Sequence, residues 1–192
     1  MGDFELLPDI TGLKESTPII ITEHDVSKLN INKSEGPDFI HPRIIYEIRH
    51  EITHPLTIIF NRSLVTQQIS EIWKCANITP IYKKGRKDEV NSYRPVSLTC
   101  ILCKIMESIV RDRIMEHFSI NNLFTNRQFG FMKGRSTVTQ LLKILDDWTK
   151  ALEIGGRIDV ICTDFKKAFD IVLHRRLISK LKTYKLHNSI IE

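Results

Sequence analysis

The chain has 192 residues, of which 42% are hydrophobic, enough to bury one core or part of a larger one. Its formal net charge of +5 and isoelectric point near 9.0 favour a polyanionic partner. No apolar run approaches the roughly 18 residues of a membrane span, and the N-terminus is acidic. We therefore expect an intracellular protein of the nucleus or cytoplasm, without signal peptide, transmembrane segment or membrane partner.

The first third of the sequence is expected to be an irregular leader followed by helices. Thr22 and Asp25 have the spacing of a capping box, and Pro42 suits the first turn of a helix. A Gly-Pro pair at residues 36–37 separates these two helices. The expected elements are an irregular leader over residues 1–20, a short helix from the capping box through Leu29, a helix starting at Pro42, and a longer helix over about 52–69.

A basic hairpin is predicted next. Residues 73–82 should be extended, and Pro80 suits an edge strand because it cannot donate to a strand ladder. The chain passes a dense basic turn at 83–87 and returns as extended chain over 93–98. Two strands joined by a basic, glycine-containing loop can fold over phosphates. A solvated loop without a ligand fits the same charges.

Two long helices with apolar stripes are predicted in the second half of the sequence. One covers residues 99–118, and the other is capped by Ser136 and closed by glycines at 155–156. Cys100 and Cys103 form a CxxC pair within the first helical pattern. Because no second pair accompanies them, we interpret them as small apolar residues on one face rather than zinc ligands.

Two further segments contain residue types that suit a functional site. Residues 124–136 interleave basic side chains with phenylalanines and glycines, which suits a nucleic-acid backbone and equally an ordinary loop with its aromatic rings packed inward. The apolar run 160–162 is predicted to be a buried strand that delivers Asp164 at its exit. A carboxylate there suits a divalent cation, although an aspartate after a strand is commonly a helix cap or turn residue. A helix is predicted after residue 176.

Taken together, these segments resemble the reverse transcriptase domain of non-LTR retrotransposons, close to the jockey-like elements of animals. The resemblance covers about residues 21–192. Its motifs occur in the order of that family: KSEGPDFIHPRII, PLTIIFNRSL, WKCANITPIYKKG, NSYRPVSLT, CKIMESIVRDRI, NNLFTNRQFGFMKGRSTVTQL and DVICTDFKKAFDIVLHRRLISKL.

The resemblance implies RNA-directed DNA synthesis by two-metal nucleotidyl transfer. Asp164 matches the first catalytic aspartate, which with the backbone carbonyl of Phe165 would hold Mg²⁺ or Mn²⁺ in the complete enzyme. Asp170 belongs to the same motif, and we expect a cap or hydrogen-bond role rather than metal binding. Three cations match groups that hold the deoxynucleotide triphosphate: Lys83, Lys84 and Arg94. Phe169 matches the steric gate that excludes a ribose 2′-hydroxyl. The segment along the RNA template and DNA primer is matched by Gln128, Gly130, Phe131, Lys133 and Arg135.

The implied fold is α+β: the fingers of a right-hand polymerase plus the first part of its palm, helix-rich with short antiparallel strands. Residues 21–156 would form the fingers-like region and 157–192 the start of the palm. The sequence reaches Glu192 before the family's second carboxylate motif, Tyr/Phe-x-Asp-Asp. We therefore expect an incomplete palm, no thumb, marginal stability and no activity alone. The full element protein would supply these parts and an endonuclease domain.

Departures from the family pattern are few. Phe39 stands where the family usually has glycine, and Leu173 replaces a common proline. Two alternatives to an enzyme fragment remain open at this point. The chain could be a noncatalytic nucleic-acid-binding remnant, or a pseudogene-derived fragment without a selected function.

Overall fold

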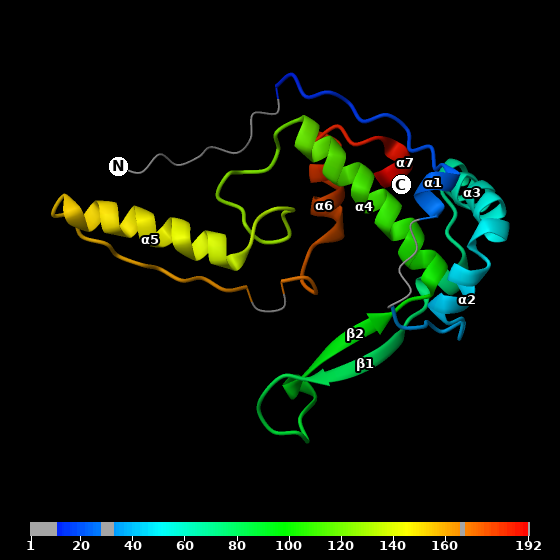
Figure 1. The fold of residues 1–192 in the computed structure, drawn as a ribbon, viewed down its shortest axis with the longest axis horizontal. Helices are drawn as coiled ribbons and strands as arrows, with labels where there is room; N and C mark the ends of the chain where they lie inside the picture. The colour runs from blue at the N-terminus through cyan, green and yellow to red at the C-terminus, as the bar shows by residue number, and fades with distance from the viewer. Residues whose placement is uncertain (1–10, 28–32, 166–167, 192) are drawn as a thin grey trace.

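The computed structural model describes residues 11–27, 33–165 and 168–191 as a helix-rich chain with one pair of antiparallel strands (Figure 1). This confirms the α+β expectation at the level of its elements. In chain order they are α1 (Glu23–Val26), α2 (Pro42–Glu47), α3 (Arg49–Thr66), the 3₁₀ turn η1 (Glu71–Lys74), β1 (Asn77–Tyr82), the 3₁₀ turn η2 (Val90–Ser92), β2 (Tyr93–Leu98), α4 (Ile101–Ile120), α5 (Thr137–Glu153), α6 (His174–Thr183) and α7 (Asn188–Ile191).

The hydrophobic core lies among α1, α2, α3 and α4, which we call the body. Phe60 of α3 is fully buried, and its ring meets the Trp73 ring edge-on at a centroid distance of 5.5 Å. The predicted stripe of α4 faces this cluster, because residues four apart lie on one side of a helix. The other buried members are Ile19, Ile21, Val26, Ile45, Leu56, Leu64, Cys100, Ile101, Cys103, Ile105 and Ile109.

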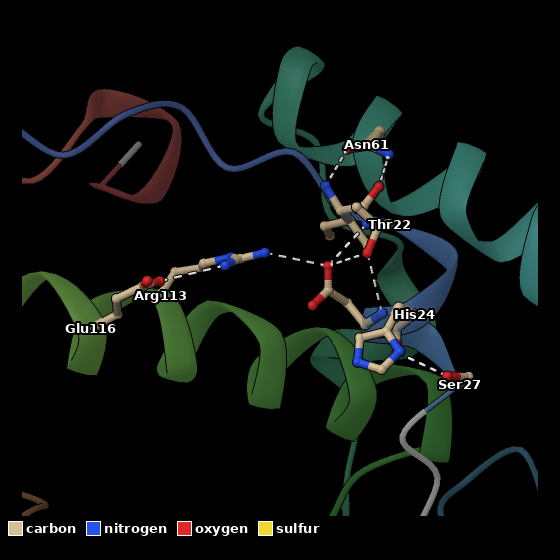
Figure 2. A network of polar contacts seen from close by, with 8 residues as sticks. Thr22, His24, Ser27, Asn61, Arg113 and Glu116 are labelled. Carbon is tan, nitrogen blue, oxygen red and sulfur yellow. Dashed lines mark hydrogen bonds and ion pairs between the residues drawn. The ribbon is translucent and has the colours of Figure 1, made fainter.

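Polar contacts around α1 fix the N-terminal segment to the body (Figure 2). Thr22 and Asp25 form the predicted capping box, and the Asp25 carboxylate also accepts from Arg113 of α4 at 3.3 Å. Asn61 of α3 accepts from the Ile21 amide at 2.9 Å and donates to the Ile21 carbonyl at 2.8 Å. Ile21 before α1 is therefore held to α3, and α1 itself is held to α4.

Several predicted helix starts are confirmed. Pro42 lies in the first turn of α2, and Ser136 caps α5 through the Thr139 amide. The cysteines of the CxxC pair are buried at the start of α4, and burial raises the pKa of the Cys103 thiol to about 12. Both thiols pack inside the body, and that of Cys103 also donates to the Trp73 carbonyl oxygen at 3.4 Å. Among the described residues no helix is both long and apolar enough to cross a membrane.

Some boundaries and one strand differ from the prediction. Residues 160–162 are irregular and exposed in the structure, so the predicted buried strand is wrong. Within the described part of the chain, no strand lies beside this run to complete its hydrogen bonds. Trp73 lies in η1 rather than in extended chain, and β1 begins only at Asn77. The short helix α7 was not predicted. The leader positions 1–10 and the helix extension to Leu29 fall outside the described residues.

The two ends of the described chain meet at the C-terminal end of α4. The His117 ring contacts the Tyr184 carbonyl oxygen at 2.7 Å, and the Ser16 amide donates to the Lys185 carbonyl at 3.0 Å. By contrast, α5 stands away from the body (Figure 1) and has no buried residue. Its apolar stripe is exposed at Val138, Leu141, Leu142, Leu145, Trp148 and Leu152.

Candidate nucleotide and nucleic-acid interface

The predicted basic hairpin is present as β1 and β2, which pair antiparallel from Asn77 opposite Leu98 to Tyr82 opposite Tyr93. The Lys83 amide donates to the Ser92 carbonyl at 2.8 Å. Because hydrogen-bonded pairs alternate along an antiparallel ladder, the facing prolines Pro80 and Pro95 occupy a pair that needs no amide donor. The hairpin therefore tolerates both prolines while it projects from the body (Figure 1).

Two tyrosines shape the tip of the hairpin. The Tyr82 hydroxyl donates to the Gly85 carbonyl at 2.7 Å, and the Tyr93 hydroxyl donates to the Lys87 carbonyl at 2.8 Å. Their rings meet edge-on with centroids 5.7 Å apart. Gly85 takes a left-handed φ of +100°, and a Cβ there would lie 2.8 Å from the Ser92 hydroxyl. The tip is thus a defined turn.

Only some of the cations at the tip have acidic partners. The Arg86 guanidinium donates to both carboxylate oxygens of Asp88, at 3.1 and 2.7 Å, and this bond lowers the pKa of Asp88. Lys83, Lys84 and Arg94 are exposed, and none has an ion pair or side-chain hydrogen bond within the described part of the chain. These three charges are available to an anionic ligand.

The basic and aromatic loop before α5 is organised by Arg135. Its guanidinium donates to the carbonyl oxygens of Thr125 (3.1 Å), Asn126 (3.1 Å) and Gln128 (2.6 Å). Lys133 in the same loop is exposed. The predicted template residues therefore differ: Arg135 directs its donors inward to the loop, whereas the Lys133 ammonium faces solvent.

The structure brings two predicted site residues together from segments far apart in sequence. The Phe131 and Phe169 rings meet edge-on at a centroid distance of 6.4 Å and an angle of 87°. The two side chains are 92% and 82% exposed. No hydrogen bond, ion pair or ring contact joins the hairpin to residues 157–165 or 168–173 in the described structure. The two halves of the predicted site are separate here.

The predicted metal-binding residues lie in irregular, exposed chain. Asp164 and Phe165 follow α5 without a strand to support them, and Asp170 lies in a turn. Across residues 11–27, 33–165 and 168–191, no three His, Cys, Asp or Glu side chains group so that they could hold a metal ion. These residues alone do not fit a metal centre, and no metal-dependent step is assigned to them.

The sequence did not predict three residues that hold the backbone of the site loops in place: Tyr82, Tyr93 and Arg135. Tyr82 and Tyr93 belong to predicted strands, and their two positions flanking a glycine-containing turn were the available signal. Arg135 was grouped with the cations of its loop because a charge pattern does not show where a guanidinium points. Its position just before a helix cap was the only sequence feature that set it apart.

Comparison with known proteins identifies the family. The model of the reverse transcriptase (RNA-dependent DNA polymerase) family matches residues 81–192. The chain is 31% identical over 158 residues to a probable RNA-directed DNA polymerase from transposon BS of Drosophila melanogaster, and 32% identical over 158 residues to the RNA-directed DNA polymerase from mobile element jockey of the same species. Each match covers 82% of this chain and 17% of the relative, so the chain spans a small part of their length. The chain belongs to the reverse transcriptase family, in the group carried by non-LTR retrotransposons such as jockey.

Proposed function

We propose that this chain forms the part of an RNA-directed DNA polymerase that binds the incoming nucleotide and the template. The exposed cations of the hairpin, within the part of the chain that matches the family, carry the proposal. In this proposal residues 21–156 act as the fingers region and 157–192 begin the palm.

Lys83, Lys84 and Arg94 would bind the triphosphate of an incoming deoxynucleotide. Arg94 stands opposite Ile81 at the tip end of the strand pair, two residues from the bonded pair Lys83 and Ser92. A guanidinium can donate to two phosphate oxygens at once, while each lysine adds a mobile point charge. Phe169 would act as the steric gate against a ribose 2′-hydroxyl.

The loop at 125–135 would follow the RNA template and DNA primer. Lys133 offers a charge to a phosphate, and Gln128, Gly130 and Phe131 line the same loop. Such contacts bind the nucleic-acid backbone and stack on bases, so they give little sequence preference and strong salt dependence.

The remaining roles belong to the longer element protein. Asp164 and Phe165 would contribute to a site for Mg²⁺ or Mn²⁺ only together with carboxylates from elsewhere. Asp170 would have a hydrogen-bond role rather than that of a cap, since Leu173 is the N-cap residue of α6 and, among the described residues, no side chain caps that helix. We include in the proposal a completed palm, a thumb and an endonuclease domain as partners within that protein, since the relatives extend well beyond the matched region.

The test is equilibrium binding of a labelled RNA template annealed to a DNA primer, measured at several salt concentrations. The variant K83A/K84A/R94A should bind more weakly, with a salt slope lower by about 1 for each cation that contacts a phosphate. A matched control, R62A/K143A/R175A, also removes three exposed charges but none from the hairpin. Equal losses in both variants would contradict a specific role for the hairpin.

Primer extension with deoxynucleotides separates the polymerase from the noncatalytic alternative. If extension occurs, D164N should abolish it and leave template binding intact. Because we expect this chain alone to be inactive, the comparison is made in the longer element protein, where binding of the duplex without primer extension would favour the noncatalytic role.

A further inference from the structure

The Arg135 side chain makes several contacts inside its own loop, chiefly through Nη1. Besides the three carbonyl oxygens it reaches the Asn126 side-chain oxygen at 3.4 Å, and its guanidinium carbon lies 5.7 Å from the centre of the Phe129 ring. One side chain at the C-terminal end of the loop therefore fixes the backbone at Thr125, Asn126 and Gln128. Its planar fork is suited to several acceptors at once, which a lysine cannot reproduce.

The loop held by Arg135 presents Phe131 in an unusual state. Phe131 has a left-handed φ of +60°, which a bulky side chain rarely adopts, and its ring is almost fully exposed. Strained, exposed positions persist where the surrounding structure over-determines them, and they gather at ligand sites. Phe169 packs edge-on against Phe131, which leaves the Phe131 ring exposed for an unpaired nucleobase to stack on.

We infer that Arg135 is a positioning residue: it binds no phosphate itself, but holds the loop so that Phe131, supported edge-on by Phe169, offers its ring to an unpaired base of the template strand. This inference rests on the proposed function and deepens it. It assigns the electrostatic part of template binding in this loop to Lys133 and the stacking part to Phe131.

The experiment uses the whole chain and a fluorescein-labelled single-stranded RNA of mixed sequence as the probe. The variants are R135K, R135Q, F131A, R135Q/F131A and K133Q, with K143Q on the exposed side of α5 as a charge control. Anisotropy gives affinity and salt slope, and hydrogen exchange reports on the amides of residues 125–131. Exchange in α4 of the same samples shows whether each variant is folded.

We expect R135K and R135Q to weaken binding about tenfold with an unchanged salt slope and faster exchange at 125–131. R135Q/F131A should bind no worse than F131A, since Arg135 acts through that ring. K133Q should lower the slope by about 0.7 and leave exchange unchanged, and K143Q should match the parent. Should R135Q not fold, R135K, which keeps the charge, provides the same test.

Two results overturn the inference in distinguishable ways. If R135K binds like the parent while R135Q loses salt slope as K133Q does, Arg135 contacts phosphate directly and only the inference fails. If the parent chain binds neither this RNA nor the template–primer duplex, the proposed function fails and the inference falls with it.

Discussion

The helices α4 and α5 carry the same kind of apolar stripe but have opposite surroundings. In α4, Ile105 and Ile109 are buried in the hydrophobic cluster of the body, whereas in α5 Leu141 and Leu145 are exposed. Both stripes follow from the helical period, and the exposed stripe of α5 is separated more sharply from the polar residues of its helix than the buried stripe of α4. The comparison teaches that periodicity predicts a helix and its apolar face, but not whether this chain supplies the surface that covers it.

Removing the central ring of the body should produce the largest loss of stability. Phe60→Ala deletes a side chain with 0% exposure and leaves a cavity beside Trp73, which should lower the free energy of unfolding by about 3–5 kcal/mol. Val65→Ala in the same helix, at a side chain 84% exposed, should change it by less than about 0.5 kcal/mol. Urea unfolding followed by circular dichroism measures both. Equal effects would mean that the body has no specific core at this site.

A smaller loss of stability is expected when a side chain is added at Gly36, where the body leaves no room for one. A Cβ on Gly36 would lie 2.5 Å from both the Cα and the amide nitrogen of Cys100, and main-chain atoms cannot swing aside. Gly36→Ala should therefore cost about 1–3 kcal/mol of unfolding free energy. Gly130→Ala, where nothing lies within 4 Å, is the matched control in the same unfolding measurement. A Gly36→Ala chain as stable as Gly130→Ala would show that the start of α4 moves freely.

The hydrogen bonds between the N-terminal segment and α3 should contribute somewhat less to the free energy of unfolding. Asn61→Ala removes the bonds to both main-chain groups of Ile21, and we expect a loss of about 1–2 kcal/mol. Asn61→Asp keeps the acceptor but sets a carboxylate oxygen against the Ile21 and Thr57 carbonyl oxygens, so its loss near neutral pH should be at least as large. Asn91→Ala, on the exposed chain before β2, serves as the control. Thermal unfolding and exchange at the Ile21 amide report the effect, and unchanged exchange in Asn61→Ala would contradict the link.

The sequence alone predicted the parts whose cause is local. The caps at Thr22 and Ser136, the proline start of α2 and the basic hairpin follow from short-range chemistry, and the structure confirms them. The strand at 160–162 was predicted wrongly because a strand needs a partner, which a single segment cannot reveal. The roles of Tyr82, Tyr93 and Arg135 depend on the folded direction of a side chain, and the contact of Phe131 with Phe169 depends on tertiary structure.

The smallest effect is expected on the exposed stripe of α5, and it tests the comparison most directly. Leu145 is 58% exposed, so Leu145→Ala removes little buried surface, and alanine is at least as good a helix former as leucine. The free energy of unfolding should change by less than about 0.5 kcal/mol, whereas Ile105→Ala on the equivalent face of α4 should cost about 2–5 kcal/mol. Both variants can be compared in one series of urea unfolding curves. A loss above about 1 kcal/mol in Leu145→Ala would mean that another surface covers the α5 stripe in solution. The two helices would then differ in which surface covers their stripe, and not in whether the stripe is covered.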